Sequence, residues 1–187
     1  MSTVSTDAGV GGGVAATKID MHSHFFPLIS QQEAKAVDPV HAPWLNIHSD
    51  ASKGDIMVGD KAFRPVHHVL WDADKRVQDL DAQGVDTQVV CATPIMFGYE
   101  WEASRTADWA ALMNDKALAF CHQHPTRLKA LAQVPLQSLA LSCQEANRAM
   151  QNGCVGVHIG NPLGDQALDA EQLVDFLIHC AENDIPV

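Results

Sequence analysis

From residue 70 onward, short apolar runs alternate with longer stretches in which apolar residues recur at helical spacing. Runs rich in Val, Ala and Cys are typical of buried strands, and amphipathic stretches that end at glycine are typical of helices. The predicted strands are 86–92, 128–134 and 154–159, and the predicted helices are 71–83, 103–122, 138–152 and 169–183. Nearer the N-terminus, Ile19 and Met21 lead into a further strand that ends before Pro27.

This alternation requires parallel strands joined by right-handed crossovers. Two architectures satisfy it, an open doubly wound sheet and a (β/α)8 barrel. The first strand is not followed by a G-x-G-x-x-G motif, which argues against the nucleotide-binding form of the open sheet. Polar or small side chains stand at the end of every strand, which is typical of a barrel with its site at the carboxyl rim. These residues are His22, His24, Thr93, Gln133, His158 and Asn161.

We therefore expect an α/β fold that is the N-terminal half of a (β/α)8 TIM barrel. A complete barrel needs roughly 250 residues, whereas a fifth strand has barely begun at Val187. We expect residues 18–187 to form one partial barrel domain, truncated at the fifth strand and unstable alone because its edge strands are unpaired. Residues 1–17 are rich in Ser, Thr, Gly and Ala, which predicts a disordered extension rather than a secretory signal.

Residues 28–70 interrupt the first strand–helix unit. Short apolar runs at 44–48, 56–58 and 62–63 are separated by polar segments that contain glycine. This pattern predicts a small antiparallel hairpin flap. In a barrel the loop that carries it lies over the active site, where long insertions are often functional.

Charge and cysteine content narrow the function classes. The chain carries 23 acidic and 12 basic side chains, a formal charge of −11, which would repel nucleic acid and acidic membranes, so we expect neither as a partner. A small anionic substrate is compatible with this charge, because a few local cations dominate a cleft. The 5 cysteines form no C-x-x-C pair and lie in apolar stretches, which predicts free thiols in a reducing compartment. With apolar runs too short to cross a bilayer, we expect a cytoplasmic protein.

The candidate chemistry centres on His22 and His24. Residues two apart on a strand point to the same side, so the two imidazoles would converge and form half of a metal site. Two ordinary loop histidines are the alternative, since His-x-His also occurs by chance. Asp20 shares their face one layer deeper, and we expect it to play a supporting polar role there rather than to bind metal.

Three further positions stay open. His158 ends the fourth strand, where it could line a pocket or bind metal. Thr93 and Met96 end the second strand and could contact a substrate, or they could belong to a turn set by Pro94.

The segment 19–27 (IDMHSHFFP) resembles the first-strand signature of the amidohydrolase superfamily. Within it the chain is most similar to the decarboxylase branch that acts on 2-amino-3-carboxymuconate 6-semialdehyde. The other stretches that carry this resemblance are 41–44 (HAPW), 63–66 (FRPV), 81–86 (DAQGVD), 91–94 (CATP), 96–99 (MFGY) and 131–137 (LAQVPLQ). The resemblance runs from about residue 18 to residue 187.

The resemblance implies a carbon–carbon lyase, a metal-dependent, non-oxidative decarboxylase of tryptophan (kynurenine) or 2-nitrobenzoate catabolism. His22 and His24 match two ligands of a divalent metal, usually Zn²⁺, and Arg64 matches an arginine that binds a substrate carboxylate, with Phe63, Thr93 and Met96 as further substrate contacts. The remaining ligands and the acid/base histidine would lie beyond Val187, so the chain alone should be inactive. A homodimer is implied for the full-length protein.

Two other functions are compatible with these residues. One is different chemistry in the same superfamily, either hydrolysis of a lactone or amide or decarboxylation of an aromatic acid. The other is an inactive half barrel. The flap favours the decarboxylase branch that acts on 2-amino-3-carboxymuconate 6-semialdehyde, because the residues around Arg64 match that branch specifically.

Overall fold

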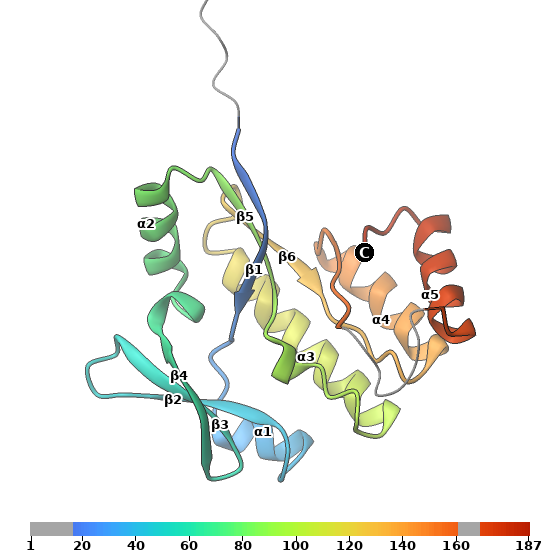
Figure 1. Cartoon of the computed structure of the whole chain (residues 1–187), viewed down its shortest axis with the longest axis horizontal. Coiled ribbons are helices and arrows are strands. Elements are labelled where there is room, and N and C mark those ends of the chain that lie inside the picture. The colour runs from blue at the N-terminus through green and yellow to red at the C-terminus, as the bar shows by residue number, and fades with distance from the viewer. Residues whose placement is uncertain (1–16, 161–168) are drawn as a thin grey trace, which may run out of the picture.

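The structure is a computed structural model, and it describes residues 17–160 and 169–187. Four parallel strands form the larger sheet in the order β1-β5-β6-β7, so strands that follow one another in this series are neighbours in space (Figure 1). They are β1 (Ile19–Phe25), β5 (Thr87–Ala92), β6 (Leu128–Ala132) and β7 (Gly156–Val157). The predicted parallel α/β arrangement is confirmed.

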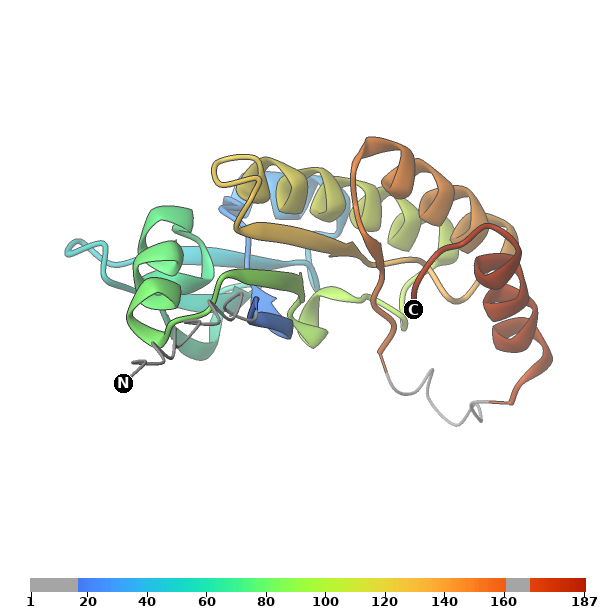
Figure 2. The same ribbon diagram turned by 90° about the horizontal axis from the view of Figure 1, so that it is seen from above.

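Four helices alternate with these strands: α2 (Ala73–Gln83), α3 (Ala103–Cys121), α4 (Leu139–Asn152) and α5 (Glu171–Glu182). All four lie within two residues of the predicted ends. Asp72 and Ser138 cap α2 and α4 by accepting backbone N–H bonds, and Gly84 ends α2 in the left-handed conformation at φ 67°. Figure 2 shows α3 and α4 together on one side of the parallel sheet. The main core lies between them and the strands, and includes Val90, Ala130 and Phe120.

The flap between β1 and α2 is a second, antiparallel sheet. Its strands are β2 (Pro43–Ile47), β3 (Lys53–Val58) and β4 (Lys61–His67), paired in that order and followed by the 3-10 helix η1 (His68–Leu70). The predicted antiparallel insertion is thus confirmed. The structure adds the helix α1 (Gln31–Val37), which begins with a reciprocal capping box between Ser30 and Glu33.

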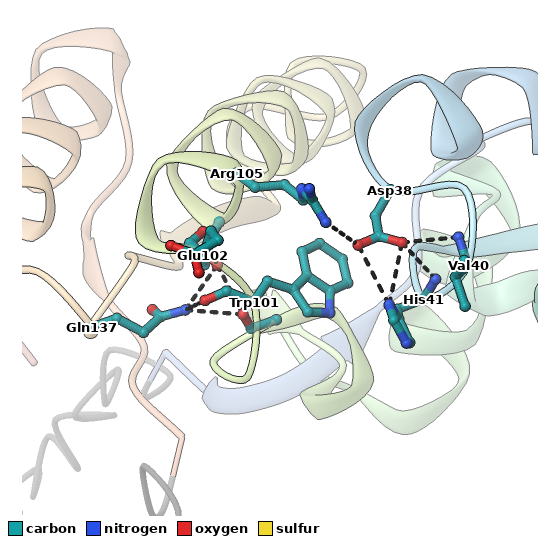
Figure 3. Close-up of polar contacts among 9 residues, drawn as sticks. Asp38, Val40, His41, Trp101, Glu102, Arg105 and Gln137 are labelled. Atoms are coloured by element: carbon teal, nitrogen blue, oxygen red, sulfur yellow. Dashed lines mark hydrogen bonds and ion pairs between the residues drawn. The ribbon is translucent and has the colours of Figure 1, made fainter.

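The flap is built onto the barrel part of the chain and does not hang free of it. A second hydrophobic cluster joins Phe26 and Ile56 to Met96, in the 3-10 helix η2 (Pro94–Met96), and to Trp109 on α3. Figure 3 shows the polar counterpart of this contact, in which Asp38 lies between His41 and Arg105 of α3. The Arg105 Nη1 donates to the Asp38 carboxylate at 2.8 Å. The flap and α3 are therefore held together by both apolar and charged contacts.

The fourth predicted strand, 154–159, is shorter in the structure, where only Gly156–Val157 has ladder pairing. Single hydrogen bonds extend the pairing beyond it, since the His158 N–H donates to Ala132 O at 2.7 Å. On the other side the Val157 N–H donates to Pro186 O at 2.8 Å, so residues near 186 lie where the fifth strand was predicted to begin. The predicted disordered extension falls almost wholly outside the described residues. Within them, no helix is long and apolar enough to cross a membrane.

Candidate metal centre

Strand β1 brings His22 and His24 together at its carboxyl end. Their Nε2 atoms are 3.4 Å apart and their ring centroids 4.9 Å apart. The Nδ1 of His24 lies 3.0 Å from Ala92 O and donates to it, so the Nε2 of His24 carries the lone pair. Two nitrogens on one tetrahedral zinc ion lie about 3.3 Å apart, given Zn–N bonds of about 2.0–2.1 Å. The pair therefore fits a divalent transition metal as it stands.

A buried arginine holds the backbone beneath this pair. Arg76 is 5% exposed, and its Nη2 donates to His24 O at 2.7 Å while its Nη1 donates to Ser23 Oγ at 3.0 Å. Burial lowers the pKa of Arg76 to about 10, so the guanidinium stays charged at neutral pH. Sequence reasoning missed this residue. The available signal was that Arg76 shares a helical face with the apolar Leu80 four residues later.

Below the histidines, β1 shifts its register between Asp20 and Ser23. Asp20 accepts a hydrogen bond of 2.7 Å from Gln88 Nε2, and the oxygen of Gln88 accepts one of 2.7 Å from Arg76. These bonds link the Asp20 carboxylate to the network around Arg76, which is the supporting polar role expected from the sequence. Asp20 supports the strand from this position, since it also accepts from the His22 N–H at 3.2 Å.

The end of β7 places a third imidazole beside the pair. The His158 ring centroid lies 5.3 Å from that of His22 and 6.0 Å from that of His24. Its Nδ1 is buried and has no hydrogen-bond partner among the described residues. Burial, together with the charges of His22 and His24, lowers the pKa of His158 to about 4, so the ring is neutral at neutral pH. The structure thus brings together three histidines from two strands.

Cys91 on β5 also lies close, since its sulfur and the nearest nitrogens of His22 and His24 are within 4.8 Å of one another. However, Cys91 Sγ is 3.4 Å from the Nδ1 of His24, the nitrogen that is already bonded to Ala92 O. Burial raises the pKa of Cys91 to about 11. Cys91 therefore packs behind His24 and is not presented to a metal.

Arg64 and Phe63 lie on the flap strand β4, and both are exposed. Burial lowers the pKa of His24, the hydrogen bond to Ala92 raises it, and the positive charges of His22 and Arg64 lower it again. The Arg64 guanidinium is therefore within electrostatic reach of the histidines. Contact of Arg64 and Phe63 with a substrate stays a prediction, for which this placement is favourable in the case of Arg64.

Thr93 and Met96, the other two predicted substrate contacts, are used inside the fold. The Thr93 hydroxyl donates to Phe25 O at 2.8 Å, and Met96 is 0% exposed in the cluster beneath the flap. Their contact with a substrate also stays a prediction, and the geometry supports it less than it supports the role of Arg64.

The sequence of the chain is similar to a known protein family and to two curated proteins. The sequence model of the amidohydrolase family matches residues 19–187. The 2-amino-3-carboxymuconate-6-semialdehyde decarboxylase of Dictyostelium discoideum is 30% identical over 165 residues, which are 87% of this chain and 45% of that protein. The chain spans about half the length of the curated relatives it matches.

Solved structures share the fold. The IDCase of Metarhizium anisopliae in its apo form has a TM-score of 0.72 at 20% identity, over 91% of this chain and 49% of that one. A dihydroxybenzoic acid decarboxylase from Polaromonas sp. JS666, with bound manganese and 2-nitroresorcinol, has a TM-score of 0.64 at 19% identity. The match covers 91% of this chain and 48% of that one. The predicted fold class is confirmed by this likeness. Since the family match spans nearly all of the described residues, the chain belongs to the amidohydrolase family.

Proposed function

We propose that the protein containing this chain is a metal-dependent decarboxylase, a carbon–carbon lyase that acts on a small anionic substrate without an oxidant. The observation that carries the proposal is the pair of Nε2 atoms of His22 and His24, 3.4 Å apart at the carboxyl end of a parallel strand. The reaction type is supported by the decarboxylase name of the relative that is 30% identical.

His22 and His24 would hold the metal. Imidazole nitrogen suits zinc and other divalent transition metals. The sequence resemblance favours Zn²⁺, and the fold is shared with a decarboxylase that was solved with manganese. When bound, the ion supplies positive charge that stabilises the electron density left on the substrate as carbon dioxide departs. Two imidazoles alone bind such an ion weakly, so the proposal includes ligands and an acid/base histidine beyond Val187.

Arg64 would bind a substrate carboxylate. Its planar guanidinium donates two parallel hydrogen bonds to a carboxylate, which lysine does not reproduce. Its charge contributes to the lowered pKa of His24, which supports a place for Arg64 on the same side of the site. In the reaction the bond to the carboxylate that leaves as carbon dioxide breaks, its electron pair stays on the substrate carbon, and a proton then replaces the lost group.

As substrate we propose 2-amino-3-carboxymuconate 6-semialdehyde, formed in the catabolism of tryptophan through kynurenine or of 2-nitrobenzoate. The name of the 30% identical relative supports this choice. A cytoplasmic location, a homodimeric full-length protein, and the absence of nucleic-acid and membrane partners complete the proposal. Phe63, Thr93 and Met96 are its further substrate contacts.

The test uses the full-length protein that contains this chain, loaded with zinc or manganese. Loss of the substrate absorbance is followed for the wild type and for His22→Ala and Arg64→Ala. Lys61→Ala is the matched control for Arg64, because Lys61 is an exposed cation on the same strand. Dihydroxybenzoate is offered in parallel as the alternative substrate.

We expect turnover of the semialdehyde that disappears in His22→Ala, weakens mainly through a higher KM in Arg64→Ala, and is unchanged in Lys61→Ala. Turnover of dihydroxybenzoate without turnover of the semialdehyde would instead support the alternative function, decarboxylation of an aromatic acid. Full activity in His22→Ala would contradict the metal site.

A further inference from the structure

His158 is the member of the histidine cluster for which the sequence left two roles open, lining a pocket or binding metal. Its backbone is fixed, because its N–H donates to Ala132 O at 2.7 Å and the neighbouring Val157 N–H donates to Pro186 O at 2.8 Å. The position of its Cα therefore follows from the order of the strands. It is set by hydrogen bonds to β6 on one side and to Pro186 on the other.

The ring of His158 is also bounded on one side by aromatic residues. The Phe97 ring lies 5.3 Å from it, and Phe97 in turn stacks on Tyr99 at 5.0 Å with an interplanar angle of 5°. The Tyr99 hydroxyl accepts a hydrogen bond from Gly160 N at 3.1 Å, which ties this aromatic wall to the strand end that carries His158. A Cβ on Gly160 would lie 2.7 Å from Phe97, so the close approach requires glycine. Phe97 and Tyr99 thus confine the imidazole to the side of His22 and His24.

The spacing of the three rings fits one ion. Imidazoles on a tetrahedral zinc ion have centroids about 5.1 Å apart, from a Zn–N bond of about 2.0–2.1 Å and about 1.1 Å from nitrogen to ring centre. The measured separations among His22, His24 and His158 are 4.9, 5.3 and 6.0 Å. Each is within 1 Å of the value for a shared ion, but the nitrogens of His158 lie outside the group of ligand atoms that are within 4.8 Å of one another, so its ring has to move toward the pair to complete the set.

The chemistry of the possible ligand atoms also favours His158 over Cys91 as the third ligand beside His22 and His24. A buried polar nitrogen without a partner is unfavourable, and the Nδ1 of His158 has none among the described residues. The competing third donor, Cys91, presents its sulfur to the bonded Nδ1 of His24 and donates its thiol proton to Ser23 O at 3.6 Å. An uncommitted nitrogen is the better ligand of the two.

We propose that His158 supplies a third nitrogen to the metal held by His22 and His24, so that the part of the barrel in this chain binds a divalent transition metal through three imidazoles. The inference rests on the proposed function, since it assumes that the His22–His24 pair binds metal. It goes beyond that function, because it assigns a ligand to the end of the fourth parallel strand and makes metal binding a property of this chain.

The test is a metal titration of the full 187-residue chain. Co²⁺ and Zn²⁺ compete against a chromophoric chelator, and the visible absorption of Co²⁺ reports the number of nitrogen ligands. His158→Gln, His24→Ala and the control His122→Gln are compared with the wild type, with circular dichroism as the check on folding. His122 is exposed at the end of α3, so its change should leave metal binding unaltered.

We expect binding of one ion, at least tenfold weaker in His158→Gln with an altered Co²⁺ spectrum, and lost in His24→Ala. Equal affinity and spectrum in His158→Gln, with loss in His24→Ala, would overturn the role of His158 while leaving the proposed metal pair intact. No binding by the folded wild-type chain would overturn the three-imidazole site, whereas the His22–His24 pair is tested separately by the activity of the full-length protein. If His158→Gln does not fold, long-range ¹H–¹⁵N NMR of the wild type decides, because a ligating His158 ring must shift when Zn²⁺ is added and a bystander must not.

Discussion

Asp38, at the junction of α1 and the flap, offers a prediction whose size follows from the structure. Its side chain is 2% exposed and accepts hydrogen bonds of 2.8 Å from the N–H groups of Val40 and His41 and from Arg105 Nη1 (Figure 3). Burial alone would raise the pKa of Asp38, but these bonds outweigh it and hold the pKa at about 2, below the ordinary 3.8. The charged form is therefore the one that the fold stabilises.

The shift from 3.8 to about 2 corresponds to about 2 kcal/mol of unfolding free energy at neutral pH. Because the folded pKa is depressed, this contribution is fully present above pH 4 and is lost as the pH falls through the folded value near 2. Linkage gives a loss of about 1 kcal/mol between pH 5 and pH 3.

The perturbation is Asp38→Asn, which keeps the shape of the side chain and removes the charge. Urea unfolding at pH 7, 5 and 3 should show the variant about 2 kcal/mol less stable than the wild type at pH 7, with the difference falling by about 1 kcal/mol between pH 5 and pH 3. Asp175→Asn, an exposed position on α5, is the control and should show no such pH-dependent difference. A difference between wild type and Asp38→Asn that is the same at pH 5 and pH 3 would refute the reasoning.

The remaining predictions concern the arginine beneath β1, the flap cluster and the metal. Arg76→Met should lower the unfolding free energy by about 3 kcal/mol, because it leaves buried acceptors unpaired, and should weaken metal binding about tenfold or more. Met96→Ala should cost about 2–5 kcal/mol in urea unfolding, since Met96 is fully buried, whereas Phe63→Ala on the exposed strand β4 should cost under about 0.5 kcal/mol. Zinc at a hundredfold excess over its Kd should stabilise the chain by about 2.7 kcal/mol, and a chelator should reverse this.

For each of these three predictions, one experimental result would contradict the reasoning. An Arg76→Met chain with unchanged zinc affinity would show that the strand holds its histidines without the guanidinium. Equal losses for Met96→Ala and Phe63→Ala would contradict the burial beneath the flap. A melting temperature that does not respond to zinc would contradict binding to the folded state.

Most of the fold could be predicted because it depends on local signals. Helical periodicity ending at Gly84 and Gly153, and apolar runs ending near Pro94 and Pro135, define elements without reference to the rest of the chain. Helix α1 could have been predicted in the same way, since Ser30 and Glu33 have the spacing of a capping box, but its seven residues are short and surrounded by turn-like sequence.

The site was less predictable, because its details are set by neighbours in space. The register shift in β1 between Asp20 and Ser23 arises where β1 pairs with β5. The burial of Arg76 depends on how α2 packs against the sheet, and the approach of His158 to His22 depends on the position of β7. His-x-His alternation correctly brought His22 and His24 together, although His22 lies within the register shift and only His24 lies beyond it.

The way the flap is attached has a consequence for ligand recognition. Since residues of β2–β4 share a cluster with Trp109, and Asp38 at the end of α1 forms an ion pair with Arg105, the flap and α3 should exchange their amide hydrogens as one cooperative unit. The backbone that carries Arg64 is then held in place before a ligand arrives, so that binding of the proposed substrate carboxylate would have to order only the exposed Arg64 side chain. Under that proposal, discrimination among anions would come from the fixed position of strand β4, so that a ligand of the wrong length is rejected by geometry and not by failure of a lid to close.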